Sequence, residues 1–392
     1  MPGPELLERH LPVLRYDSLG SFLADSPAVL TDRVSPASGE ANLLKRADGS
    51  VLASAKGGRR RPRLALGFLG AAAYGDGAAV ARSDYLDAVG SDYVAQAREM
   101  HRGRYVDRAF GHVASDSDGA LYLQYWFFYL YNDKAFLGFG LHEGDWEMVQ
   151  IKLGPDERPE AMTFAQHTHG QRCGWPLVER RGQRPVVYVA RGSQASYPSA
   201  GRHKAPVVPD YADGRGAEVS PTLEVISEAE PGWAAWPGRW GSTKARNRLE
   251  ANSPRGPAHQ EKFSDPATFH EEADELERLR AAPEPPPPAP PQPTIAARRE
   301  GGRAIVAYRF PRRRAGVPEP ATLVVSLDSP DDALPPATYA HAVEGPAGEV
   351  EHPLALEEDR AYEVLASAAD VDGNASEPAM TRLPEAGGQT GT

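Results

Sequence analysis

Residues 142–153 read His-Glu-Gly-Asp-Trp-Glu-Met-Val-Gln-Ile-Lys-Leu, and this stretch decides the fold that we expect. Its second half alternates apolar and polar side chains, which is the pattern of a strand with one buried face. Side chains two positions apart share a face, so Asp145 and Glu147 should line up with Val149 and the apolar side chains after it. Trp146 should point to the opposite face. We therefore expect two carboxylates at the rim of a sheet core.

Further strands are indicated on both sides of this stretch. Residues 105–113 and 121–131 flank the turn sequence Asp-Ser-Asp-Gly at 116–119, which predicts a hairpin. Apolar runs at 162–166 and 185–190 predict two more strands. The expected fold class is mainly β, an antiparallel β-sandwich with helical decorations.

Two segments are expected to be helical. Residues 83–101 place apolar side chains three and four positions apart, which is typical of an amphipathic helix. Residues 269–279 form an acidic run that reads as a short helix.

A proline-rich segment divides the chain. Eight of the eleven residues at 283–293 are proline, which favours an extended, stiff linker between a large domain at 1–282 and a smaller one at 294–386. Short apolar runs separated by turns predict that the smaller domain is also a β-sandwich. Residues 362–376 resemble the last two strands of a fibronectin type III domain, which implies a spacer or a module that binds a protein partner. Residues 387–392 are expected to be a disordered tail.

Composition narrows the classes of function. The net charge of the 392 residues is −11, which argues against a general nucleic-acid binder. The single cysteine, Cys173, excludes an internal disulfide bond and a multi-cysteine zinc site. No stretch approaches the roughly 20 apolar residues of a transmembrane helix, and no secretory signal is visible. We expect a cytoplasmic protein, with leaderless export left open.

The acidic stretch is the first candidate site. Carboxylate oxygens are preferred by Ca²⁺ and Mg²⁺, and imidazole with carboxylate also suits Mn²⁺ and Zn²⁺. We expect His142, Asp145 and Glu147 to hold a divalent cation beside the aromatic run at 125–129. The alternative is a buried ion-pair cluster in which nearby arginines neutralise the acids.

Two further segments supply candidates for chemistry. His167 follows the strand at 162–166 and is a candidate general base, as is Glu143. The strand at 185–190 runs into a polar loop, where binding groups usually lie. The predicted ligand-binding residues are Arg191, Ser193, Gln194 and, from the aromatic run, Trp126.

Three segments in this order, 125–129, 142–147 and 188–197, resemble the vacuolar-protein-sorting-associated protein 62-like family. Residues 236–241 (Trp-Pro-Gly-Arg-Trp-Gly) and 253–257 (Ser-Pro-Arg-Gly-Pro) are similar to later pieces of that family. The resemblance names a fold group rather than an activity. The family usually has histidine where this chain has Gln194.

The same acidic stretch also resembles the Gly-His-Arg-His-Asp-Trp-Glu motif of the necrosis- and ethylene-inducing peptide-like proteins. In those β-sandwich proteins the motif holds a divalent cation that takes part in binding sphingolipid head groups. The resemblance implies His142, Asp145 and Glu147 as the ligands here. Glu143 and Gly144 stand where that motif has Arg and His.

We therefore expect a cation-dependent protein that binds a polar or anionic head group of a lipid or glycan, or another small molecule. One alternative is an enzyme that uses the same cluster, either a metal-dependent hydrolase or lyase or a metal-free acid–base enzyme such as a cyclase. A second alternative is a structural adaptor that acts through its C-terminal domain.

Overall fold

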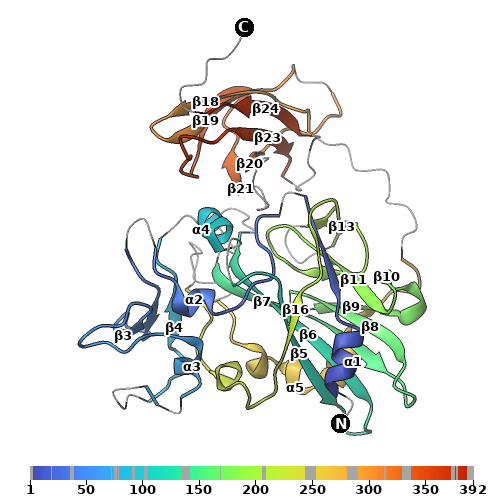
Figure 1. Cartoon of the computed structure of the whole chain (residues 1–392). Coiled ribbons are helices and arrows are strands. Elements are labelled where there is room, and N and C mark those ends of the chain that lie inside the picture. Colours follow the sequence, from blue (N-terminus) through green and yellow to red (C-terminus); the bar gives the residue numbers. More distant parts are fainter. Residues whose placement is uncertain are drawn as a thin grey trace.

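The computed structural model describes most of the chain and confirms that the protein is mainly β (Figure 1). The described residues are 3–18, 20–35, 39–71, 73–74, 77, 79–90, 93–100, 105–133, 142–167, 169–204, 209–242, 253–279, 290–312, 315–328, 337–371, 376 and 378–385. The segments predicted as a linker and as a disordered tail lie largely outside them. No helix among these residues is long and apolar enough to cross a membrane.

A seven-stranded sheet forms the centre of the protein. Its strands in spatial order are β16 (Thr222–Val225), β5 (Arg108–Ser115), β6 (Leu121–Asn132), β7 (His142–Leu153), β8 (Pro159–Gln166), β9 (His169–Gly174) and β17 (Asp274–Glu275). The five inner strands are antiparallel, whereas both edge strands pair in parallel. The predicted hairpin is β5–β6. Residues 125–130 are fully buried, because both faces of β6 are covered.

A smaller sheet covers one face of the central sheet. It contains β10 (Arg180–Arg181), β11 (Arg184–Val189), β1 (Val13–Tyr16), β15 (Glu218–Val219) and β12 (Ser196–Tyr197). β1 and β11 are parallel, so the sandwich is not purely antiparallel. The Tyr125 hydroxyl donates to the carbonyl of Leu7, which lies in α1 (Gly3–Arg9), over a distance of 3.0 Å. The Gln166 side chain donates to the carbonyl of Ser196 in β12.

Short helices and aromatic side chains cover the other face. α5 (Glu261–Ser264) and α6 (Pro266–Glu272) accept hydrogen bonds through backbone carbonyls from Gln124 and Gln150 of the sheet. The 3-10 helices η2 (Gly232–Ala235) and η3 (Pro257–His259) lie on the same side, and η1 (Trp175–Leu177) follows β9. Trp146 packs at 6.3 Å from Trp233, measured between ring centroids.

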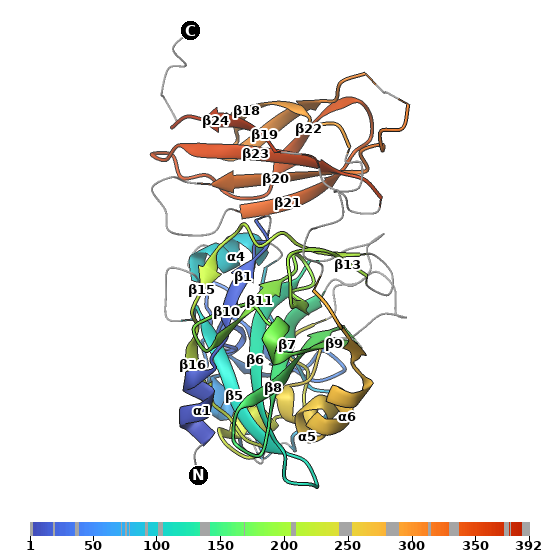
Figure 2. The same cartoon turned by 90° about the vertical axis from the view of Figure 1, so that its right-hand side faces the viewer.

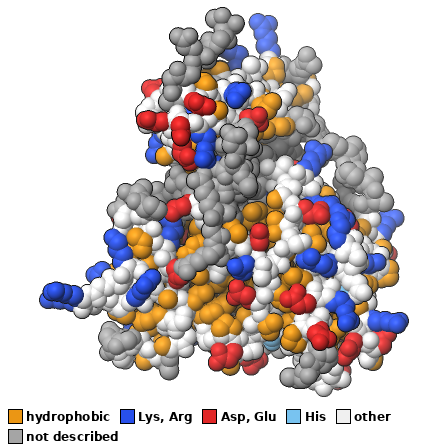
Figure 3. Space-filling view, in the orientation of Figure 1, with side chains coloured by type: hydrophobic (Ala, Val, Ile, Leu, Met, Phe, Trp, Pro, Cys, Tyr) orange, Lys and Arg blue, Asp and Glu red, His pale blue; other side chains and the backbone are white. Residues whose placement is uncertain are grey.

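The remaining elements lie at the margins. β3 (Val51–Ser54), β2 (Leu43–Lys45) and β4 (Tyr85–Asp87) form a three-stranded sheet near α2 (Val29–Asp32) and α3 (Leu66–Leu69). β13 (Gly201–His203) pairs with β14 (Asp210–Ala212). On the face in Figure 3, hydrophobic side chains gather in the middle of the larger part, and acidic and basic side chains are mixed around them.

Both predicted helices differ from the structure. Residues 83–101 contain β4, a turn, and only then α4 (Tyr93–Met100). The pairing of β4 with β2 holds the first part extended, and Gly90 adopts a φ of 97°, which ends any helical continuity. The acidic run at 269–279 is helical only within α6, because Asp274 and Glu275 pair with β9 as β17.

The C-terminal strands form two sheets of their own. One contains β18 (Thr294–Glu300), β19 (Arg303–Arg309) and β22 (Ala347–His352), and the other contains β21 (Ala337–Ala342), β20 (Thr322–Asp328), β23 (Tyr362–Ala369) and β24 (Ala379–Leu383). Figure 2 shows these strands as a separate block beyond α4. Arg98 of α4 donates to the Leu327 carbonyl at 3.2 Å, which connects the two parts.

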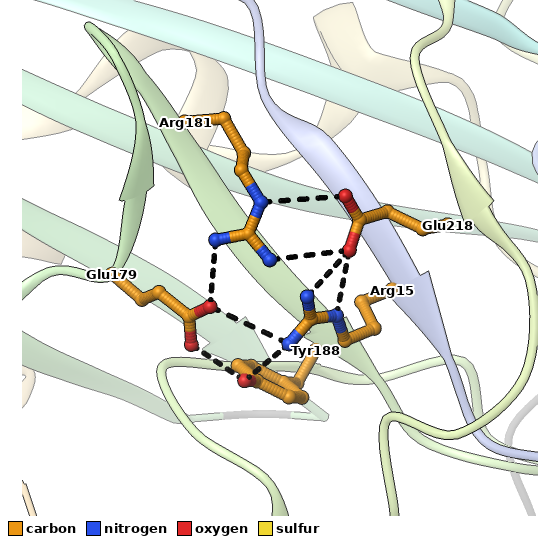
Figure 4. Close-up of polar contacts among 5 residues, drawn as sticks. All are labelled: Arg15, Glu179, Arg181, Tyr188 and Glu218. Carbon is orange, nitrogen blue, oxygen red and sulfur yellow. Dashed lines mark hydrogen bonds and ion pairs between the residues drawn. The ribbon is translucent and has the colours of Figure 1, made fainter.

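An ion-pair network ties together the strands of the smaller sheet (Figure 4). The guanidinium of Arg15 contacts the Glu218 carboxylate at 2.5 Å and the Tyr188 hydroxyl at 3.0 Å. The Tyr188 hydroxyl donates to Glu179 at 2.6 Å. Arg181 pairs with both acids. The charges therefore link β1, β11 and β15 with the residues around β10.

We expect Arg15→Ala to lower the free energy of unfolding by about 1 kcal/mol, because it removes the centre of this network at the surface. The loss should shrink at high salt, which screens exposed charges. Urea denaturation at low and high ionic strength measures both effects. Arg158→Ala is the matched control, since Arg158 is 85% exposed and contacts only Asp156 among the described acids. Equal losses in the two variants would contradict the prediction.

Candidate functional site

Strand β7 places the two predicted acids inside the sandwich. Asp145 pairs with Tyr129, and Glu147 pairs with Phe127. These positions share the face of the sheet that the smaller sheet covers. Trp146 points to the other face, where it contacts Trp240 at 5.7 Å between ring centroids. The period of two in the sequence therefore predicted the orientation of these side chains.

Gly144 shapes the strand just before these acids. Its φ is 60°, in the left-handed region, and a Cβ atom at this position would lie 1.6 Å from the carbonyl oxygen of Trp240. Only glycine lets the segment around Trp240 cross the strand at this distance. The close approach also brings Ser242 next to Glu143.

Neither acid is neutralised by an arginine, which was the alternative. Asp145 accepts hydrogen bonds from the Asn132 side chain and from the backbone N–H of Trp146, each at 2.9 Å. Glu147 is 6% exposed, and its buried Oε2 atom has no hydrogen-bond donor among the described residues. Within those residues, no lysine or arginine forms an ion pair with either carboxylate. The two acids are therefore desolvated without a bonded cation.

Burial raises the pKa of Glu147 well above its ordinary value, and the negative charge of Asp145 acts in the same direction. The positive charge of Lys262 opposes this shift. Lys262 lies over the Trp126 ring, on the opposite face of the sheet from Phe127 and Glu147. We conclude that Glu147 keeps a proton at a pH where an exposed glutamate is charged.

We expect Glu147→Gln to stabilise the protein at pH 8 by roughly 1–3 kcal/mol and to have little effect at pH 4. A raised folded-state pKa favours folding at low pH, and this contribution is lost as the pH rises through the folded-state value. Glutamine carries no such penalty. Denaturant titrations at pH 4, 6 and 8 measure the difference, with Glu160→Gln in the exposed part of β8 as the control. A wild type that is more stable than the variant at pH 8 would contradict this reasoning.

A second buried acid, Asp210 of β14, lies close enough to Glu147 to raise its pKa further. Asp210 accepts hydrogen bonds from the Ser193 hydroxyl at 2.6 Å, from the Tyr197 hydroxyl at 2.6 Å and from Nε2 of His167 at 2.7 Å. Burial and the charge of Asp210 raise the pKa of Tyr197. Asp210 thus gathers three groups from two segments of the chain, residues 193–197 and the residue after β8.

His167 is the most accessible member of this cluster, with a side chain that is 26% exposed. Its φ is 52°, in the left-handed region, which costs energy for a residue with a Cβ atom. Asp210 binds Nε2, so Nδ1 is the ring nitrogen without a hydrogen-bond partner in the part of the chain that the structure describes. The predicted residue His167 therefore lies in the cluster. We call Asp145, Glu147, Asp210 and His167 the rim site.

Glu143 and His142, a predicted base and a predicted metal ligand, bind other parts of the chain and not the rim site. Glu143 is fully buried, and its two oxygens accept hydrogen bonds from the Tyr93 hydroxyl, from the Ala88 N–H and from both the N–H and the hydroxyl of Ser242. These contacts tie Glu143 to the segments around Tyr93 and Ser242, and its role as a general base stays a prediction. His142 directs Nδ1 to the carbonyl of Gly144 at 2.9 Å.

The described residues do not bring His142, Asp145 and Glu147 together as a metal site. No group of three histidine, cysteine or acidic side chains within them is arranged to hold an ion, and the oxygens of Asp145 already accept two hydrogen bonds. The donor set as it stands does not fit a cation. The divalent cation stays a prediction that only a metal-binding measurement tests.

The four predicted ligand-binding residues separate into two groups. Ser193 joins the cluster through Asp210, and Gln194 is buried nearby with a φ of 54° and no donor to its Oε1 atom among the described residues. The Arg191 guanidinium instead lies over the Tyr211 ring at 5.1 Å. Trp126 is fully buried on the far face of the sheet, so it cannot contact a ligand at the rim site.

Sequence reasoning missed Asp210 and Tyr197 as members of the site. Asp210 lies 43 residues after His167 in the chain, and no local pattern marks it. Tyr197 follows the polar loop that contains Ser193. Its hydroxyl donates to Asp210 of β14, and no local pattern predicts this contact.

Comparisons with known proteins give weak matches. No protein-family model matches the chain, and no curated protein matches it. Among solved structures it is similar to a non-toxic protein, HaNLP3 (11% identity, TM-score 0.30, covering 69% of this chain and 90% of that one). It is also similar to Necrosis and Ethylene inducing Protein 2 from the causal agent of cocoa's Witches Broom disease (13%, TM-score 0.29, 59% and 77%). A third match is NLPPya in complex with glucosamine (10%, TM-score 0.24, 33% and 56%).

Proposed function

We propose that this protein binds the polar head group of a glycan or lipid at the rim site, and that the recognised group carries an ammonium or several hydroxyl donors. The observation that carries this proposal is the buried Oε2 atom of Glu147, which has no hydrogen-bond donor within the described part of the chain and lies close to Asp145 and Asp210. A buried acceptor without a donor costs about 1–3 kcal/mol, so a ligand that supplies the donor gains affinity.

The sign of the charge distinguishes between ligands. Asp145, Glu147 and Asp210 make the site acidic, and Arg191, which was expected to meet an anion, is engaged with the Tyr211 ring. An anion would meet repulsion here, whereas an ammonium would be stabilised by the carboxylates. We therefore favour a cationic or neutral head group over an anionic one.

Glucosamine and glucose are suitable probes, because they differ in the amino group that the acids should recognise. Isothermal titration calorimetry is expected to show glucosamine binding at least tenfold more tightly than glucose. Asp145→Asn should reduce this preference, whereas Glu160→Gln should leave it unchanged. If neither sugar binds the wild type, or if both bind equally to all variants, the proposal is wrong.

The same titration with EDTA tests the predicted Ca²⁺, Mg²⁺, Mn²⁺ or Zn²⁺. Loss of glucosamine binding on chelation, restored by one of these ions, would support a cation as part of the site. Unchanged binding would show that the carboxylates recognise the head group directly. Metal analysis of wild type and Asp145→Ala provides an independent measure.

Acid–base catalysis is a second candidate, favoured by the pairing of His167 with Asp210 at 2.7 Å in a site that also contains Glu147, a carboxyl group whose pKa is raised by burial. An imidazole held by a carboxylate and an acid with a raised pKa are suited to act as base and acid on one substrate. Turnover on a panel of glycosides, esters and phosphodiesters tests this function. Activity that survives chelation and is lost in His167→Gln would establish it over simple binding.

The family, the role of the C-terminal domain and the cellular location are also proposals. The motifs at 188–197, 236–241 and 253–257 support membership of the vacuolar-protein-sorting-associated protein 62-like family. We propose that residues 294–386 are a fibronectin type III-like module that spaces the rim site or binds a protein partner. The cytoplasmic location stays a prediction.

A further inference from the structure

A polar cleft lies apart from the rim site, and none of the rim-site residues lines it. It has a volume of about 530 Å³ and is lined by Ala47, Arg82, Ser83, Tyr85, Arg239, Gly241, Ser242 and Arg255. Three of these eight residues are arginines and none is acidic. The cleft is therefore a concentration of positive charge on a protein whose net charge is −11.

Backbone pairing brings the arginines together. Arg239 forms a parallel bridge with Tyr85 and an antiparallel bridge with Arg255. Its N–H donates to the Asp84 carbonyl at 2.9 Å, and its carbonyl accepts from Leu86 at 3.0 Å. Because β4 lies on one side and the segment at 253–255 on the other, the position of Arg239 is fixed on both sides. The cleft is thus built by the fold rather than by flexible side chains.

The guanidinium groups contact neutral partners. Arg239 donates to the carbonyl of Ser253 at 3.0 Å, and Arg255 donates to the carbonyl of Pro237 at 3.1 Å. Arg82 is exposed, and the described residues offer it no ion pair. Each guanidinium has five N–H donors, so most of the donors remain for a ligand.

The nearby carboxylates already have partners. Asp84 is buried and binds Arg46 at 3.1 Å and the Tyr74 hydroxyl at 3.0 Å. Asp87 binds Lys45 and, together with the buried Glu143, the hydroxyl of Ser242 in the wall of the cleft. Burial and the positive charge of Arg255 lower the pKa of Arg239, which reflects two like charges held close together. An anion placed between them would relieve this repulsion.

We propose that the cleft lined by Arg82, Arg239 and Arg255 binds a phosphate or sulfate group. The planar guanidinium fork matches the oxygens of these anions, and the hydroxyls of Ser83 and Tyr85 can donate further hydrogen bonds. The anion could be carried by a soluble phosphorylated compound or by a lipid, because both present the same oxygens. This site has the opposite charge preference to the rim site, so the two would recognise different groups.

Calorimetry with inorganic phosphate, at an ionic strength held constant with chloride, tests the site. Arg82→Ala should weaken phosphate binding at least fivefold without affecting folding, because Arg82 is exposed and has no bonded partner among the described residues. Arg239→Lys, which keeps the charge but loses the fork, should also weaken binding. Arg158→Ala should bind like the wild type. Glu147→Gln should bind phosphate normally, which separates this site from the rim site.

Absence of phosphate and sulfate binding by the wild type would overturn the proposal, as would equal binding by the wild type and Arg82→Ala. Co-sedimentation with phosphatidylcholine vesicles that contain phosphatidic acid identifies the source of the anion. Sedimentation that requires phosphatidic acid and is reduced in Arg82→Ala would support a lipid phosphate. Phosphate binding without vesicle binding would support a soluble phosphorylated compound.

Discussion

Gly144→Ala should lower the free energy of unfolding by more than about 4 kcal/mol. Losses this large have a specific cause, and here the cause is a backbone clash. The added Cβ atom would lie 1.6 Å from the Trp240 carbonyl oxygen, so either β7 or the segment around Trp240 must move. Movement would separate Ser242 from Glu143 and open the tryptophan cluster behind Trp146. Thermal and urea denaturation measure the loss.

Gly182→Ala is the matched control for this result. Gly182 has a φ of 67°, close to the 60° of Gly144, but a Cβ atom there would meet nothing within 4 Å. It should therefore show only the backbone cost of a left-handed alanine, about 1 kcal/mol. Similar losses in the two variants would mean that the crossing at Trp240 is not a tight contact.

Asp210→Ala should cost about 3–5 kcal/mol of stability, because it removes the shared acceptor of a buried network. The hydroxyls of Ser193 and Tyr197 would lose the oxygen to which they donate hydrogen bonds. His167 would lose the contact that orients its ring. Asp210→Asn should cost less, since its amide keeps one oxygen acceptor.

The His167 ring provides a second measurement of the Asp210 variants. Its nitrogen chemical shifts should change in Asp210→Asn, because the oxygen that binds Nε2 changes from a carboxylate to an amide. Nuclear magnetic resonance spectra of the two proteins measure this change. Identical shifts would contradict the contact at 2.7 Å between His167 and Asp210.

The sequence predicted what depends on local pattern. Alternation along residues 142–153 predicted that Asp145 and Glu147 face the interior, and the turn at 116–119 predicted the hairpin of β5 and β6. These features follow from the two-residue period of a strand and from turn chemistry. The same alternation, combined with the register of β6 and β7, places Trp126 on the face away from the acids.

What the sequence could not predict depends on contacts between distant segments. Glu143 was predicted as a general base, and no local pattern indicated that Ser242, 99 residues away, binds its carboxylate. Asp210 reaches the site because β14 pairs with β13 and because the Tyr211 carbonyl of β14 accepts a hydrogen bond from the Arg191 N–H. The prediction of one helix over residues 83–101 was wrong for its first part, because the pairing of β4 with β2 outweighs the helical spacing of the apolar side chains.

The central claim is that Glu147 is a buried acid with a raised pKa and that a ligand supplies the hydrogen-bond donor that its Oε2 atom lacks among the described residues. Proton release on ligand binding tests this claim most directly. Titrating glucosamine in two buffers of different ionisation enthalpy, at several pH values, counts the protons released. We expect wild type to release more protons than Glu147→Gln, because burial raises the pKa of Glu147 and a bound ammonium favours its charged form. Glucosamine binding without proton release, or with the same release in both proteins, would contradict the account.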